Sequence, residues 1–193
     1  FEAFEFMSLN ASGAGAIGLN RPFLSNAANT LYTKEVFDKL QSSIRQDLPS
    51  GDDIFLLLAQ KKDNPSAIAF AKDKAALVTT APQKSLSTFI AQRRRWTSKS
   101  VHYHDFDILW VAFVITLFNL AFVFSLFGGL WHRPFWEATM LLYLAKTIID
   151  LPLLWSAARF YKNQKCLPAV LVFQLLYPIY ITFTVASGFI GKI

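Results

Sequence analysis

A run of 23 residues without a charged side chain, from Ile108 to Leu130, constrains the fold of this 193-residue chain more than any other feature. Thr116 and Asn119 are the most polar residues in its interior. An α-helix rises about 1.5 Å per residue, so the run would be roughly 34 Å long, and the hydrocarbon core of a bilayer is about 30 Å thick. The run therefore predicts a transmembrane helix.

Two further apolar segments, at about 135–158 and 167–190, predict a second and a third transmembrane helix. The second contains Lys146 and Asp150, which are four residues apart and share one helix face. A charge near the bilayer centre costs about 2.5–3.5 kcal/mol on insertion scales, so we expect the two side chains to pair. Two interpretations stay open: a structural ion pair that faces other helices, or a polar lining for a translocation path.

Charged residues divide the chain into two unlike parts. Residues 1–105 contain 13 Lys or Arg and 10 Asp or Glu, whereas residues 106–193 contain 6 and 3. The positive-inside rule predicts an integral protein of the cytoplasmic or inner membrane, with residues 1–105 in the cytoplasm and the C-terminus outside. The net charge of +6 then reflects orientation and attraction to the lipid bilayer, and no nucleic-acid partner is expected. The basic residues on the expected cytoplasmic side are Arg93, Arg94, Arg95, Lys99, Arg159, Lys162 and Lys165, and those on the other side are Arg133 and Lys192.

Local patterns predict short elements in the cytoplasmic part. The expected helices are 1–18, 34–40 with Thr33 as N-cap, and 54 to about 60, and the expected strands are 28–32, 67–71 and 76–80. Segment 83–99 predicts an amphipathic helix that lies in the membrane interface. Its apolar side would carry Leu86, Phe89, Ile90 and Trp96, and its arginines would lie on the other side.

Two patterns match ligand-binding motifs only formally. Residues 13–18 fit GxGxxG, but Pro22 follows closely and opposes the helix that a dinucleotide site needs, so we expect small-residue helix packing or a turn. Residues 102–107 read His-Tyr-His-Asp-Phe-Asp, a set of side chains that can bind a transition metal. The simpler interpretation is the polar edge of a membrane span, and no metal ligand is assigned in this chain.

Two other signals fit together chemically. Asp52 and Asp53 open a predicted helix, where the helix dipole favours negative charge, and residues 92–96 read Gln-Arg-Arg-Arg-Trp just before the membrane. Arg95 offers a planar donor fork for a diphosphate, and Gln92 lies one helical turn earlier. The Trp96 ring offers a flat face for a sugar, and a nearby carboxylate can remove a proton from a hydroxyl.

The arrangement resembles the membrane-bound family 2 glycosyltransferases, which include cellulose, chitin and hyaluronan synthases. Residues 92–96 fit the QxxRW motif of that family, and Gly51-Asp52-Asp53 is similar to its acidic base motif. Residues 26–32 and 34–37 are similar to the family segment that lines the acceptor site. The resemblance covers about residues 1–105 by motif and 106–193 by topology alone.

The resemblance implies an α/β fold: the C-terminal half of an A-type glycosyltransferase domain at 1–83, an interfacial helix at 84–105 and a membrane domain at 106–193. It implies inverting transfer from a nucleotide-sugar to a glycan or lipid acceptor, with a divalent metal, Mg²⁺ or Mn²⁺, in the whole enzyme. By the same resemblance, the catalytic base is Asp53, the diphosphate ligands are Gln92 and Arg95, and the acceptor contacts are Trp96, Asn29 and Asp52.

One departure from the family pattern limits these expectations. The nucleotide-contacting Asp and the metal-binding DxD of the family precede the acceptor segment, and Asp105-Phe106-Asp107 follows QxxRW instead. We therefore expect this chain to be the C-terminal part of an enzyme, inactive alone, whose metal ligands lie upstream. QxxRW favours a processive polysaccharide synthase over a single transfer. The alternatives are a non-catalytic membrane partner of a synthase and a transporter-like membrane protein.

Overall fold

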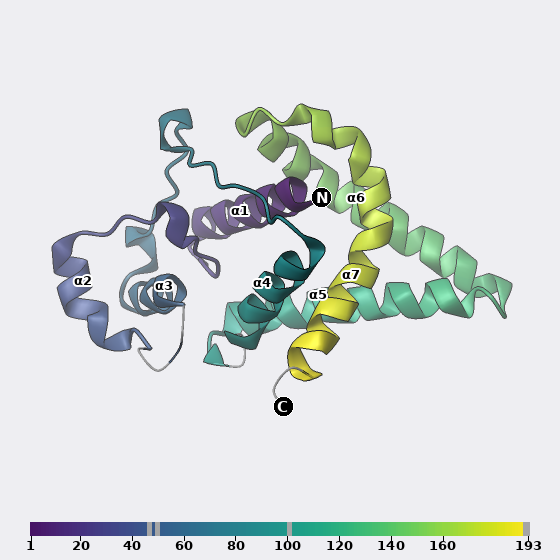
Figure 1. Ribbon diagram of the computed structural model, residues 1–193, viewed down its shortest axis with the longest axis horizontal. Helices are drawn as coiled ribbons and strands as arrows, with labels where there is room; N and C mark the ends of the chain where they lie inside the picture. The colour runs from purple at the N-terminus through teal and green to yellow at the C-terminus, as the bar shows by residue number, and fades with distance from the viewer. Residues whose placement is uncertain (46–47, 49–50, 100–101, 191–193) are drawn as a thin grey trace.

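The computed structural model describes the whole chain except residues 46–47, 49–50, 100–101 and 191–193, so Lys192 lies outside the described residues. The described α-helices are α1 (Glu2–Gly18), α2 (Lys34–Leu40), α3 (Asp52–Asp63), α4 (Leu86–Lys99), α5 (Phe106–Gly128), α6 (Arg133–Phe160) and α7 (Val170–Ile190) (Figure 1). Short 3₁₀ helices lie between them: η1 (Ala27–Asn29), η2 (Gln41–Ser43), η3 (Pro65–Ala67), η4 (Lys74–Ala76) and η6 (Gln164–Ala169).

The predicted α/β fold is wrong, because the described residues contain helices and no strand. The segments predicted as strands instead begin with 3₁₀ turns at η1, η3 and η4. Each turn is capped by a side-chain oxygen that accepts the backbone N–H two residues later, which competes with sheet pairing. The capping residues are Asn26, Asn64 and Asp73, with N···O distances of 3.1, 3.1 and 2.8 Å. An A-type glycosyltransferase domain at 1–83 is therefore not present in the described residues.

The same segments keep extended backbone angles after their turns. The φ and ψ angles are −117° and 131° at Thr30. They are −97° and 123° at Ile68, and −73° and 121° at Leu77. Local strand preference is thus visible, but a strand is stable only when a neighbouring segment forms a ladder with it. Within the described residues these stretches have no such neighbour.

The predicted helices of the first part are confirmed. Thr33 caps α2 by accepting the backbone N–H of Val36 at 3.2 Å. Helix α3 begins after Gly51, whose φ of 112° is the left-handed conformation that suits glycine. The GxGxxG pattern lies inside α1, so it forms no dinucleotide loop. A Cβ added at Gly13 would lie 3.5 Å from Cβ of Leu24, an ordinary van der Waals distance, and a Cβ at Gly15 or Gly18 would meet no atom within 4 Å.

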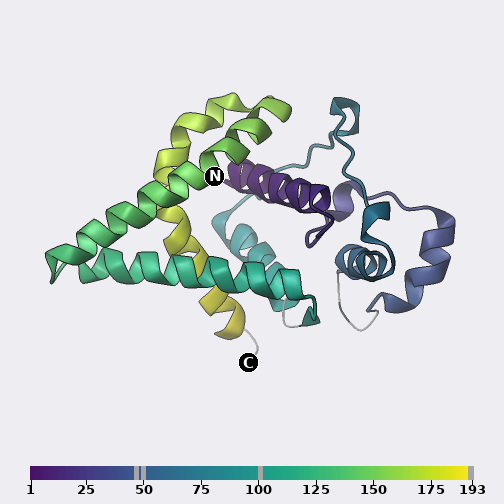
Figure 2. The same cartoon turned by 180° about the vertical axis from the view of Figure 1, so that it is seen from behind.

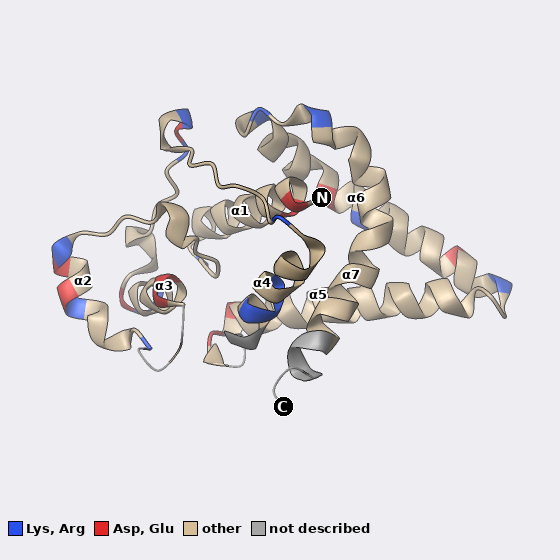
Figure 3. Cartoon of the chain, viewed as in Figure 1, with Lys and Arg blue, Asp and Glu red and all other residues tan. Residues whose placement is uncertain are grey.

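In the part of the chain that the structure describes, three helices are long and apolar enough to cross a membrane: Phe106–Gly128, Arg133–Phe160 and Gln164–Ala186. They match the spans predicted at 108–130, 135–158 and 167–190, so the prediction of three membrane-length apolar helices is confirmed. Most of their large apolar side chains are exposed in the structure, which suits contact with lipid. Figure 3 shows that charged residues are sparse on α5, α6 and α7.

Helices α5 and α6 form a hairpin (Figures 1 and 2). Its turn is tight, because a Cβ on Gly128 would lie 2.9 Å from the Phe135 ring. Further along the hairpin, buried Thr139 donates a hydrogen bond to Ser125 at 2.9 Å. Helix α7 crosses and contacts α5, and α4 lies against α7.

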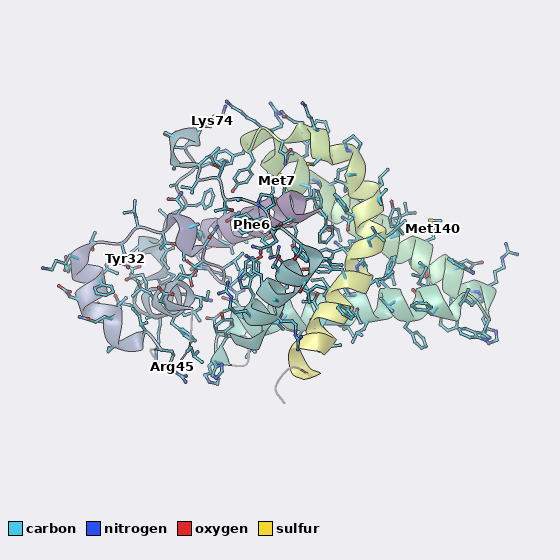
Figure 4. The ribbon with its side chains drawn as sticks, viewed as in Figure 1. Phe6, Met7, Tyr32, Arg45, Lys74 and Met140 are labelled. Carbon is cyan, nitrogen blue, oxygen red and sulfur yellow. The ribbon has the colours of Figure 1, made fainter. Side chains whose placement is uncertain are left out.

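The core lies where the first helix meets the second and third membrane helices. Helix α1 contacts α6 and lies beside it in Figure 1. Met7, labelled in Figure 4, belongs to this core. An apolar N-terminal helix is thereby attached to the membrane helices. The buried core residues are Phe4, Met7, Leu154, Ala157, Ala158 and Val170.

Candidate functional site

A buried ion pair fixes helix α4 to two other helices. The guanidinium of Arg93 donates from Nε and Nη2 to Oε2 of Glu5 on α1, at 3.0 and 2.6 Å. Both side chains are 4% exposed. The hydroxyl of Tyr180 on α7 donates to the other carboxylate oxygen of Glu5 at 2.8 Å. Both oxygens of Glu5 therefore have partners, which is what a buried carboxylate requires.

The same guanidinium contacts two residues of the QxxRW motif. Arg93 lies over the Trp96 ring at 4.2 Å from its centroid and over the Phe89 ring at 4.3 Å. Its Nη1 donates a hydrogen bond to Oε1 of Gln92. Residues at spacings of three and four lie on one helix face, so Phe89, Arg93 and Trp96 form one side of α4. The structure thus brings Gln92 and Trp96 together through Arg93.

The expected distribution of arginines on α4 is wrong in one respect. Arg93 lies on the buried side with Phe89, whereas Arg94 and Arg95 are exposed. Leu86, placed on the apolar side by the sequence, is 73% exposed. The outer face of α4 carries a shallow depression of about 460 Å³, lined by Leu86, Ser87, Ile90, Ala91 and Arg94. This mixed apolar and basic face suits the interfacial position that the sequence predicted.

The acidic pair lies in the first turn of α3, as predicted. Asp52 is exposed, and Asp53 accepts the backbone N–H of Ala27 at 3.0 Å. The amide of Asn29 donates to the backbone oxygen of Ala76 at 2.5 Å. The structure therefore brings Asp53 to the turn that contains Asn29, although these residues are 24 positions apart. Among the described residues, neither carboxylate forms a hydrogen bond or ion pair with Gln92 or Trp96.

Tyr103 links the Asp53 region to the segment that follows α4. Its ring lies edge-on to Phe55 of α3, with centroids 5.7 Å apart. Burial, and then the negative charge of Asp53, raises the pKa of the Tyr103 phenol to about 12. The carboxylate of Asp53 thus affects a residue only seven positions beyond Trp96. Sequence patterns did not single out Tyr103 for this role.

The acidic residues near the start of α5 bind basic side chains. Lys61 donates to both oxygens of Asp105 at 2.8 Å and to Asp107 at 2.7 Å. Arg21 pairs with Asp107 at 2.8 Å. Asp105 also caps α5 by accepting the N–H of Ile108 at 3.1 Å. No group of three metal-ligating side chains occurs in the part of the chain that the structure describes.

Lys146 and Asp150, near the middle of α6, contact side chains on α7. Lys146 pairs with Asp150, and the Gln174 amide donates to Asp150 at 2.9 Å. The Lys146 ammonium lies 5.5 Å from the centroid of the Tyr177 ring. These contacts join the two helices and support the structural ion pair rather than the translocation path.

Comparisons of the chain with protein-family models, with curated proteins and with solved structures found no match.

Proposed function

We propose that this chain takes part in inverting glycosyl transfer from a nucleotide-sugar to a glycan or lipid acceptor, at the cytoplasmic face of a membrane. The observation that carries the proposal is the pairing of Gln92 and Trp96 around one guanidinium, on a helix that precedes a membrane-length helix. An amide and exposed arginines suit a diphosphate, and an indole suits a sugar ring.

In this proposal Asp53 acts as the general base. Its carboxylate removes the proton from an acceptor hydroxyl, and the oxygen attacks the anomeric carbon from the face opposite the leaving group. The bond from that carbon to the diphosphate oxygen breaks, and the nucleoside diphosphate leaves with the electron pair. Asp53 lies in the first turn of α3, where its carboxylate accepts the backbone N–H of Ala27.

The other residues hold the two substrates. Gln92 and Arg95 bind the donor diphosphate, whose negative charge increases as the bond breaks. Trp96 stacks on the acceptor sugar, and Asn29 and Asp52 are further acceptor contacts. A divalent metal, Mg²⁺ or Mn²⁺, is part of the proposal, and no residue named here is proposed as its ligand. A processive polysaccharide synthase is the preferred form of the activity.

Substitution in the full-length protein tests the assignment. Membranes are incubated with a panel of labelled nucleotide-sugars, and transferred sugar is measured. General-base catalysis contributes about 10²–10⁴-fold, so Asp53→Asn lowers transfer by at least about 100-fold. Asp63→Asn is the matched control on the same helix, because its side chain pairs with exposed Lys39. Wild-type transfer by both Asp53→Asn and Trp96→Ala would reject the proposal and favour a non-catalytic partner or a transporter.

A further inference from the structure

The geometry points to Arg93 as a positioning residue, held by Glu5, that orients Gln92 for the donor diphosphate and Trp96 for the acceptor sugar. This inference rests on the proposed function and adds to it a residue outside the three that define QxxRW. It also brings α1 and α7 into the construction of the site, through side chains far from the motif in sequence.

The first step is that Arg93 is held by a carboxylate that is itself held by a second helix. Its Nε and Nη2 groups point to one oxygen of Glu5, and Tyr180 binds the other oxygen. At 4% exposure, neither charge can exchange its partner for water at low energetic cost. The guanidinium plane is therefore fixed relative to α1 and α7, and α4 is fixed with it.

The second step concerns which atoms Gln92 presents. Because Nη1 of Arg93 donates to Oε1 of Gln92, the acceptor end of this amide is already bound. The remaining Nε2 group carries two donors, and phosphate oxygens accept hydrogen bonds. Arg93 thus selects the amide orientation that suits an anion. A lysine at this position lacks the planar fork needed to reach Glu5 and Gln92 together.

The third step concerns the Trp96 ring. The guanidinium of Arg93 lies over the Phe89 ring and over the Trp96 ring, 4.3 and 4.2 Å from their centroids. Stacking of this kind restricts ring rotation and covers one face of the indole. A sugar would then stack on the opposite face. The same group therefore sets both the diphosphate contact and the sugar platform.

A spectroscopic measurement tests the placement of Trp96 without requiring activity. The full-length protein is expressed with 5-fluorotryptophan and purified into detergent micelles. Its ¹⁹F NMR spectrum is recorded, and the resonance that is absent from Trp96→Phe is assigned to Trp96. Arg93→Lys is expected to shift or split this ¹⁹F resonance, and the matched control Arg94→Lys is expected to leave it unchanged. An unchanged Trp96 resonance in Arg93→Lys overturns the inference.

Kinetics in the same protein test the link to Gln92. Arg93→Lys is expected to raise the donor KM by about tenfold with a smaller effect on kcat. In a Gln92→Ala background the same change is expected to add nothing, because the group it orients is absent. Equal, additive increases in both backgrounds would indicate a merely structural role and overturn the inference.

A second variant keeps the inference testable if the first does not fold. A separate outcome, the absence of sugar transfer by the wild-type protein, tests the proposed function alone. If Arg93→Lys does not fold, Glu5→Gln provides both measurements, since it keeps the side-chain size and removes the charge that holds Arg93. If the wild-type protein transfers sugar from no nucleotide-sugar, the proposed function fails. The ¹⁹F measurement then decides by itself whether Arg93 positions Trp96.

Discussion

Three consecutive arginines of α4 have different environments because successive residues on a helix are turned by about 100°. Arg93 is 4% exposed, whereas Arg94 and Arg95 are exposed. A buried guanidinium requires a partner, and Glu5 is 88 positions away. Local spacing on α4 could not reveal this pairing. The available signal was Glu5 itself, one of two acidic residues at the start of a helix rich in apolar and small residues.

At Tyr103 the charge of Asp53 has a measurable consequence. Burial first and Asp53 second raise the pKa of the phenol from 10.0 to about 12. A negative neighbour opposes phenolate formation, so Asp53→Asn is expected to lower the pKa of Tyr103 while the effect of burial remains. Tyrosine ¹³C NMR in a pH titration measures this change, with Asp63→Asn as control. An unchanged Tyr103 titration in Asp53→Asn would show that the carboxylate does not act on this phenol.

The sign of the linked stability follows from the raised pKa. Because the folded protein holds the Tyr103 proton more tightly than the unfolded chain does, the contribution to the free energy of unfolding is complete below pH 10.0. It is lost as the pH rises through about 12. Asp53→Asn lowers the upper limit of this pH range, so the stability contribution of Tyr103 is expected to be lost at a lower pH than in the wild type.

At the scale of elements, helices and strands differed in how well the sequence predicted them. A helix forms its hydrogen bonds within one segment, so Thr33, the acidic pair and apolar spacing identified α1, α2, α3 and the membrane helices. A strand forms its bonds with another segment. The residues at 67–71 and 76–80 have strand-like composition, but Asn64 and Asp73 capped 3₁₀ turns at their starts.

Glycines in two different environments give a paired prediction for helix stability. A Cβ at Gly128 would lie 2.9 Å from Cγ of Phe135, so Gly128→Ala must displace the ring and is expected to destabilise the α5–α6 hairpin by about 1–3 kcal/mol. Gly15 of α1 has no heavy atom near its Cβ position, so Gly15→Ala is expected to stabilise the protein by up to about 1 kcal/mol. Thermal unfolding in micelles, followed by circular dichroism, compares them. Equal melting temperatures would contradict the packing at this turn.

Lys61 attaches α3 to the start of α5. Its ammonium lies 2.8 Å from Asp105 and 2.7 Å from Asp107, and it is 14% exposed. Lys61→Ala leaves two acidic side chains close together, so we expect α3 to detach more often. Proteolysis of a transiently opened segment follows the population of the open state. Chymotrypsin cleavage within residues 34–63 is therefore expected to be about tenfold faster in Lys61→Ala, and unchanged in the exposed control Lys62→Ala. Equal cleavage rates in Lys61→Ala and Lys62→Ala would show that Lys61 does not attach α3 to α5.

At the scale of the whole molecule, each group of candidate residues is connected to a membrane-length helix by its own ion pairs and hydrogen bonds. Glu5, Arg93 and Tyr180 join the α4 motif to α1 and α7, and Lys61 with Asp105 and Asp107 joins the α3 carboxylates to α5. Local spacing in the sequence predicted that the QxxRW residues lie on one helix and that the acidic pair opens another. It could not predict the joining contacts, because their partners are 44 to 175 positions apart.

The orientation predicted by the basic residues can be measured directly. Cys166 is the single cysteine of the chain, so Cys166→Ser gives a background for Ser66→Cys, His132→Cys and Gln164→Cys, which replace exposed neutral residues. Arg93, Arg94 and Arg95 favour a cytoplasmic side for α4, and the α5–α6 turn then lies outside. A membrane-impermeant maleimide is expected to label His132→Cys in intact cells, and to label Ser66→Cys and Gln164→Cys only after permeabilisation. Labelling of Ser66→Cys in intact cells would reverse the orientation and place Asp53 on the side without nucleotide-sugars.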